Sequence, residues 1–260
     1  MGFKCGIVGL PNVGKSTLFN ALTASKNAEA ANFPFCTIDP NIGIVDVVDI
    51  RLDKLTELSK SKKKIYTNIT FVDIAGLVKG ASKGEGLGNK FLSHIREVDA
   101  IIHLVRCFES DKITHVNSQI NPVEDLETIK TEIILSDLDI VQKKLEKGKK
   151  KLLQEKEVKI LEDKLKLLNA GNEASIKDEF EKKFLTTLGL LSIKPKIIVC
   201  NVDEESLATG NAFTEDVKKK YTNEKIVTIC ADIEDQIMGL DNNERETFMK
   251  EIGLNKTGLN

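Results

Sequence analysis

Short runs of β-branched and other apolar residues alternate along the chain with stretches that have a helical pattern. Several runs are apolar on both faces, as strands buried between two layers of helices are. The alternation predicts an α/β fold with a doubly wound, mostly parallel sheet. We interpret as strands the runs Lys4 to Val8, Gly43 to Val48, Ile69 to Ile74, Ala100 to Val105, Lys196 to Cys200 and Ile226 to Cys230, and as helices Gly14 to Ala24 and Asn89 to Val98.

The pattern changes over 123–188, where strand-like runs vanish and apolar residues recur at three- and four-residue steps on both sides of Gly148. Two helices that meet near Gly148 and end near Gly171 would bury their apolar stripes against each other. We therefore predict an inserted antiparallel helical hairpin, a coiled coil, within a sheet domain made of 1–122 and 189–260.

Charge adds to this picture only at the tip of the hairpin. The whole chain has 38 Lys and Arg against 40 Asp and Glu, so its net charge of -2 does not point to any particular class of partner. The tip is basic, and it would be able to contact the phosphates of a nucleic acid. The hairpin is thus either a solvated pair of helices or a partner-binding element. The lysines of the tip are Lys143, Lys144, Lys147, Lys149, Lys150 and Lys151, opposed by Glu146.

Composition places the chain among ordinary globular proteins. Hydrophobic residues make up 41% of the 260 residues, which excludes disordered and low-complexity classes. The 5 cysteines are far apart and form no CxxC pair, so we expect them to be reduced. The apolar runs fall far short of the roughly 18 residues that span a bilayer. We expect a cytoplasmic, monomeric protein that does not enter membranes.

A phosphate-binding motif follows the first predicted strand. The segment Gly9-Leu10-Pro11-Asn12-Val13-Gly14-Lys15-Ser16 matches G-x-x-x-x-G-K-[ST]. In this motif backbone amides surround phosphates, the lysine reaches the β and γ groups, and the hydroxyl ligates magnesium. The helix that follows adds its free amides and its dipole. We predict a nucleoside triphosphate site that involves Asn12, Val13, Gly14, Lys15, Ser16 and Thr17.

A second motif closes the third predicted strand. Asp73-Ile74-Ala75-Gly76 places an aspartate where it would hold the magnesium shell and the Gly76 amide where it would meet a γ-phosphate. Thr37, between the first helix and the second strand, would complete the magnesium ligands. The glycine-rich stretch after Gly76 suits a loop that orders on the triphosphate and relaxes afterwards.

Taken together, these segments resemble the YchF subfamily of Obg-related P-loop proteins, the Obg-like ATPases. The resemblance implies a cytosolic ATPase that associates with ribosomes and carries a helical hairpin insert. Family members continue into a small C-terminal TGS domain beyond the position of Asn260. The resemblance covers essentially the whole chain and rests on 6–17, 32–37, 73–81, 84–89 and 248–254.

The preferred base is predicted from the segment after the fifth strand. A guanine reader needs Asn-Lys-x-Asp, whereas this chain has Asn201-Val202-Asp203-Glu204, without the lysine and with glutamate last. Adenine offers an amino donor beside the N7 acceptor, which the carboxamide of Asn201 would match. Family members with this altered motif favour ATP. We expect ATP as the ligand, with GTP and a GTPase of the Obg class as the alternative.

Hydrolysis requires a group that orients water. Ras-type enzymes use a glutamine directly after D-x-x-G, but this chain has Leu77, so we expect slow intrinsic hydrolysis. The family resemblance assigns a catalytic role to His115, beside Lys15 and Gly76. Asn12 would either help to hold a potassium ion or stabilise the turn. A further alternative is a nucleic-acid-binding module, for ribosome or rRNA, in which the nucleotide is structural.

Overall fold

In the described part of the chain, a six-stranded sheet contains all the predicted strands, with ends that differ by at most two residues. The computed structural model describes residues 2–27, 41–74, 87–110, 119–148, 153–252 and 258. Strand β2 pairs antiparallel with β3, and the other pairs are parallel, which confirms the mostly parallel α/β sheet. In spatial order the strands are β2 (Ile42–Val47), β3 (Thr67–Asp73), β1 (Phe3–Val8), β4 (Ala100–Arg106), β5 (Lys196–Asn201) and β6 (Ile226–Ile229).

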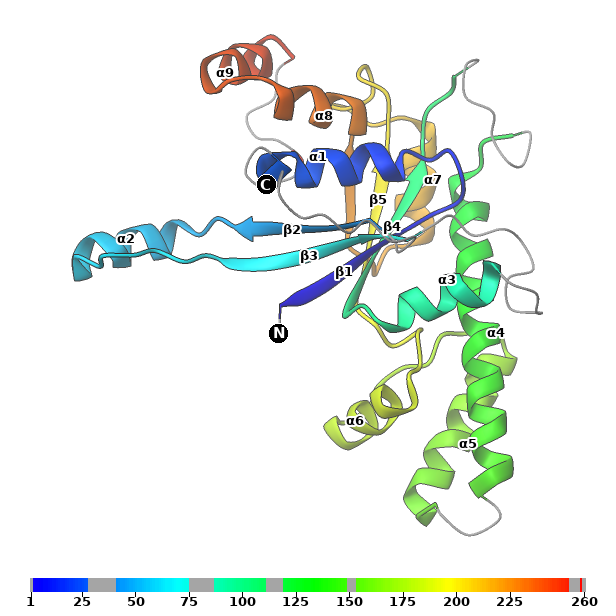
Figure 1. The fold of residues 1–260 in the computed structure, drawn as a ribbon. Helices are drawn as coiled ribbons and strands as arrows, with labels where there is room; N and C mark the ends of the chain where they lie inside the picture. The colour runs from blue at the N-terminus through cyan, green and yellow to red at the C-terminus, as the bar shows by residue number, and fades with distance from the viewer. Residues whose placement is uncertain are drawn as a thin grey trace.

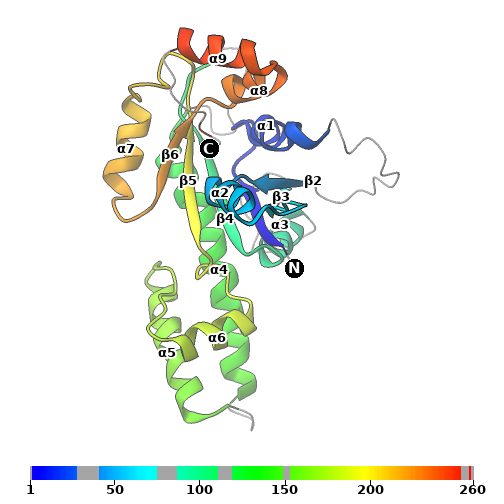
Figure 2. The same cartoon turned by 90° about the vertical axis from the view of Figure 1, so that its left-hand side faces the viewer.

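Helices cover both faces of the sheet (Figures 1 and 2). The central strands are therefore buried on both sides, which explains why their sequences are almost continuously apolar. Leu18 and Phe19 from one layer and Ile129 and Ile133 from the other belong to the same buried cluster. One layer holds α1 (Lys15–Asn27), α8 (Ala231–Gly239) and α9 (Asn242–Glu251), and the other holds α3 (Leu87–Arg96), α4 (Pro122–Gly148) and α7 (Ala212–Lys220).

The edge strand β2 leads into a helix that the sequence did not reveal. Helix α2 (Ile50–Ser59) joins β2 to β3 at the far end of the sheet and buries none of its residues (Figure 1). Asp49 caps its first turn by accepting a hydrogen bond from the Arg51 amide, and Lys60 ends it in a left-handed conformation. The helix is thus defined by its caps rather than by an apolar face.

The described residues of the inserted segment form three helices rather than two. Helix α4 continues away from the sheet, α5 (Glu155–Asn169) returns beside it, and α6 (Glu179–Leu188) packs across the pair (Figure 2). These helices share an apolar core of their own, separate from that of the sheet, in which Val141, Leu161 and Leu185 are fully buried. Among the described residues, neither these helices nor any others are long and apolar enough to cross a membrane.

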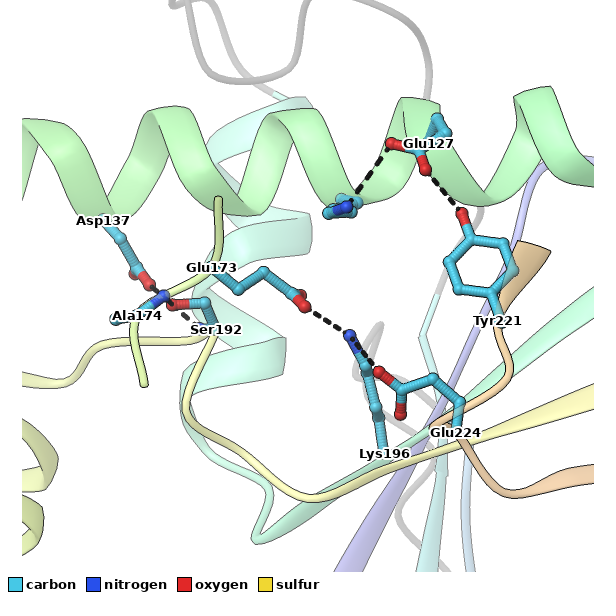
Figure 3. Close-up of polar contacts among 9 residues, drawn as sticks. Glu127, Asp137, Glu173, Ala174, Ser192, Lys196, Tyr221 and Glu224 are labelled. Atoms are coloured by element: carbon cyan, nitrogen blue, oxygen red, sulfur yellow. Dashed lines mark hydrogen bonds and ion pairs between the residues drawn. The ribbon is translucent and has the colours of Figure 1, made fainter. Parts of the chain in front are cut away.

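Polar contacts join the insertion to the sheet domain (Figure 3). Lys196, at the start of β5, lies between two carboxylates, 2.5 Å from Glu173 Oε2 and 3.2 Å from Glu224 Oε1. The hydroxyl of Tyr221 donates to Glu127 Oε1 of α4 at 2.9 Å. These partly buried pairs attach the segment after α5 to the start of β5, and α4 to the end of α7.

Asp137 of α4 makes a second connection to the chain that leads into β5. Its carboxylate is fully buried and accepts hydrogen bonds from the Leu191 amide at 2.8 Å and from the Ser192 amide and hydroxyl at 2.9 and 2.6 Å. Burial raises the pKa of Asp137, and these three bonds oppose that rise. The carboxylate thereby ties α4 to the chain between α6 and β5.

Candidate nucleotide-binding site

The loop between β1 and α1 has the tight backbone expected of a phosphate-binding loop. Asn12 and Gly14 have positive φ angles of 63° and 95°. Such left-handed residues occur in loops whose successive backbone N–H groups form an anion-binding concavity. Glycine is required at position 14 for a second reason, because a Cβ atom there would lie 2.4 Å from Asn201 Nδ2. The loop therefore rests directly on the end of β5.

Lys15 occupies the N-terminus of α1 and is mostly buried. Its Nζ donates to the carbonyl of Leu10 at 2.7 Å, which holds the amine over the loop. Burial lowers the pKa of Lys15, an effect that the charge of Asp73 partly opposes. A phosphate in the loop would offer this desolvated ammonium a stronger partner than a carbonyl oxygen.

Ser16 and Asp73 come together as predicted for magnesium ligands. Ser16 Oγ donates to Asp73 Oδ2 at 3.2 Å, which links the first turn of α1 to the end of β3. The other oxygen of Asp73 is buried and has no hydrogen-bond partner within the described part of the chain. A buried oxygen of this kind is a preferred ligand of a hard cation.

Ser16 and Asp73 fit a metal ion that takes only some of its ligands from the protein. The described residues contain no group of three or more His, Cys, Asp or Glu side chains placed to hold a metal. Magnesium at a triphosphate site takes only a few protein ligands, among them one or two carboxylates, and completes its shell with phosphate oxygens and water. Ser16 and Asp73 are suited to that role.

Asn201, at the end of β5, is tied to the protein by both ends of its carboxamide. Its Nδ2 donates to the carbonyl of Val13 at 2.9 Å, and its Oδ1 accepts from the Ala231 amide at 2.9 Å. The side chain thus connects the phosphate loop to the first turn of α8. One N–H and one lone pair of the carboxamide remain for a ligand.

A pocket of about 210 Å³ opens beside Asn201, at the carboxyl ends of β5 and β6. Ligands of doubly wound sheets bind at this edge of the strands. The pocket combines apolar side chains with several carboxylates, so it suits a flat ring that carries an amino group. Its lining residues are Phe108, Asn201, Val202, Asp203, Glu204, Cys230, Asp232, Ile233 and Gln236.

The structure places the remaining predicted residues in different ways. Val13 is fully buried and reaches the site through its backbone carbonyl, whereas Asn12 is exposed and Thr17 half-buried in the first turn of α1. Val202 is buried and lines the pocket. The predicted residues Thr37, Gly76 and His115 lie outside the described residues.

Sequence reasoning missed Arg106 and Phe108. Arg106 ends the apolar run of β4 and is buried, and Phe108 follows it into the pocket. The sequence did offer one indication, because a single arginine closes an otherwise apolar strand. A charge buried at such a position requires hydrogen-bond or ion-pair partners nearby.

The curled loop, the lysine over it and the serine beside a strand-end aspartate define the class of the protein: a P-loop nucleotide-binding protein. Residues 4–137 match a family described as "50S ribosome-binding GTPase". The chain belongs to the YchF family. It is 50% identical, over its whole length and 74% of the relative, to the protein named "Ribosome-binding ATPase YchF" in Escherichia coli O157:H7.

Other relatives agree with this assignment. The protein of the same name in Bacillus subtilis (strain 168) is 47% identical over the whole chain and 74% of its own length. A solved structure described as the Schizosaccharomyces pombe YchF GTPase superposes with a TM-score of 0.82 at 34% identity, covering 98% of this chain and 72% of that one. Their names disagree on the nucleotide, so the choice between ATP and GTP has to be argued from the pocket beside Asn201.

Proposed function

We propose that this chain binds magnesium and ATP, hydrolyses ATP to ADP and phosphate, and associates with ribosomes as a cytoplasmic, monomeric switch. Two contacts carry the proposal. Ser16 donates to Asp73, and Lys15 donates to the Leu10 carbonyl of the phosphate-binding loop. The relatives named as ribosome-binding ATPases support the choice of reaction and partner.

The residues of the loop would act on the charge that develops during the reaction. Lys15 and the loop amides bind the β- and γ-phosphates and stabilise the negative charge on their oxygens. Ser16 and Asp73, with Thr37, would hold magnesium, which neutralises phosphate charge when bound. In this proposal the Gly76 amide contacts the γ-phosphate, and His115 orients the attacking water.

We infer a preference for ATP over GTP from the residues at the end of β5. The lysine and the aspartate of the guanine-reading motif are replaced by Val202 and Glu204, whereas its asparagine is kept as Asn201, and all three residues line the pocket. Acceptor oxygens suit the amino group of adenine, and the free N–H of Asn201 suits its N7. ATP and GTP should be titrated against a bound fluorescent adenine nucleotide. Equal or tighter displacement by GTP would contradict the assignment.

Potassium forms a separate part of the proposal. Asn12 stands exposed on the phosphate loop, where its side-chain oxygen could help to hold a monovalent ion beside the phosphates. Hydrolysis should then be faster in potassium than in sodium at equal ionic strength. Identical rates in the two salts would leave Asn12 with the role of a turn residue.

The helical insertion is our candidate for the ribosomal contact. Near the tip of α4, Lys147 is exposed, Lys144 is half-buried, and the exposed Lys143 pairs with Asp139. Each lysine that contacts a phosphate contributes about one unit to the salt dependence of binding. Replacing Lys143, Lys144 and Lys147 with alanine should weaken ribosome binding and flatten its salt dependence.

A matched variant controls for the loss of charge. Lys60, Lys62 and Lys63 are exposed after α2, which lies away from the helical insertion (Figure 1), and their replacement removes the same charge. If both triple variants bind ribosomes equally, the tip is not the contact. If the tip variant loses hydrolysis together with binding, the two activities are not separable. Ribosome or rRNA binding that survives without any nucleotide would favour the alternative of a nucleic-acid-binding module.

A further inference from the structure

An arginine is buried at the end of β4, beside the pocket next to Asn201, which we call the base pocket. Arg106 is the last residue of this strand, and only 1% of its surface is exposed. Burying a guanidinium is costly unless its N–H groups are hydrogen-bonded, so a buried arginine marks a place where those bonds do structural work. The acceptors of Arg106 therefore indicate what it holds.

The guanidinium donates to the chain that leaves β4. Its Nε donates to the carbonyl of Phe108 at 3.0 Å, and its Nη2 donates to the carbonyl of Ser110 at 3.4 Å. The guanidinium carbon also lies 4.8 Å from the centroid of the Phe108 ring, which is a cation–π distance. Arg106 thereby contacts both the backbone and the ring of Phe108.

Phe108 lines the base pocket together with Asn201. Arg106 and Asn201 are register partners at the ends of β4 and β5, and the Cys107 amide donates to the Asn201 carbonyl at 2.7 Å. The two strand ends are therefore fixed to each other by backbone bonds. Phe108 lies beyond the end of β4, so strand pairing does not place its ring.

We propose that Arg106 is a positioning residue that holds the Phe108 ring as one wall of the pocket for the purine base. The inference rests on the proposed function, because it requires a nucleotide whose base enters this pocket. Lys15, Ser16 and the loop amides bind the triphosphate independently of Arg106. Loss of Arg106 should therefore weaken the contribution of the base to affinity and leave that of the phosphates unchanged.

The test compares a ligand that has a base with one that has none. Calorimetry would give the Kd of ATP and of inorganic tripolyphosphate, both with magnesium, for the full chain and its variants. Arg106→Met should bind ATP about tenfold more weakly, which corresponds to about 1.4 kcal/mol. Its affinity for tripolyphosphate should stay within about twofold of the wild type, a difference of about 0.4 kcal/mol.

Further variants keep the proposal testable if Arg106→Met does not fold. Arg106→Lys keeps the charge but not the fork that reaches two carbonyls, so its ATP affinity should fall by a smaller factor. Phe108→Leu should reproduce the loss seen for Arg106→Met. Arg96→Met is the control, because Arg96 is an exposed arginine that donates to the Ser136 hydroxyl outside the site.

Two results would overturn the inference. One is an ATP affinity that is unchanged in both Arg106→Lys and Phe108→Leu. The other is a parallel loss of affinity for ATP and tripolyphosphate, which would indicate a general structural role. A wild-type chain that binds neither ligand would instead refute the proposed function, so the two failures are distinguishable.

Discussion

Replacing Asn201 with alanine tests whether this side chain supports the site or only reads the base. The substitution removes the donor to the Val13 carbonyl and the acceptor for the Ala231 amide, and Asn201 is only 4% exposed. Each buried polar group left without a partner costs about 1 to 3 kcal/mol. We therefore expect the protein without nucleotide to lose about 3 kcal/mol of stability.

The loss should be visible in both thermal and chemical unfolding. A loss of 1 kcal/mol lowers the Tm of a chain of this size by about 2 to 4 °C, so we expect a fall of about 6 to 12 °C. Asn121→Ala is the matched control, because Asn121 is an exposed asparagine whose Oδ1 accepts from the Glu124 amide at 3.1 Å. Losing this exposed contact at the start of α4 should cost about 1 kcal/mol.

The alternative role gives a different result. If Asn201 only reads the base, Asn201→Ala should unfold like the wild type without nucleotide and show its defect only in ATP affinity. A stability change of less than about 0.5 kcal/mol, the range of ordinary surface substitutions, would thus refute the supporting role. Asn201→Asp sharpens the comparison, because it keeps the acceptor for Ala231 but places a second oxygen against the Val13 carbonyl.

Three further predictions concern pH, metal and the insertion. Burial, with a smaller contribution from Lys196, lowers the pKa of His103 from 6.5 to about 3. As the pH falls below about 6.5, the unfolded chain takes up a proton at His103 before the folded chain does. The free energy of unfolding is therefore full above about pH 6.5 and lower by about 2 kcal/mol at pH 5. Denaturant unfolding of His103→Gln should lack this dependence of stability on pH. Asp73→Asn should remove the magnesium dependence of ATP affinity in calorimetry; an undiminished effect of magnesium would exclude Asp73 as a ligand. Lys164→Met should destabilise by about 3 to 5 kcal/mol because it leaves the buried Glu181 carboxylate unpaired, and adding Glu181→Leu should restore most of the loss in urea unfolding.

The strands were predictable because burial between two helical layers determines both their composition and their length. Strand β4 shows the limit of that signal. Its apolar run ends at Val105, but the strand continues through Arg106, because backbone pairing with β5 does not depend on side-chain polarity. The direction of β2 was not predictable, since a short antiparallel edge strand has the same residue pattern as a parallel one. Helix α2 escaped notice because it buries none of its residues.

The site was predictable where its residues are contiguous in sequence. The phosphate loop and the strand-end Asp73 belong to short motifs whose chemistry fixes residue types and spacing. The base pocket is different, because it joins residues from after β4, β5 and β6 that only the parallel register brings together. The sequence identified Asn201 as a base reader, whereas its two buried hydrogen bonds assign it a structural task as well.

These contacts imply that nucleotide affinity and the stability of the sheet edge are coupled. Val13 belongs to the phosphate loop, and Ala231 begins the helix beside the base pocket, so the carboxamide of Asn201 connects both segments to the end of β5. A ligand that binds only the folded state stabilises it by RT ln(1 + [L]/Kd). In the proposed function Asn201 also contacts the base, so Asn201→Ala has a higher Kd for ATP than the wild type has. The same concentration of ATP should therefore restore less stability to Asn201→Ala than to a variant of equal instability in the helical insertion, whose Kd for ATP is unchanged.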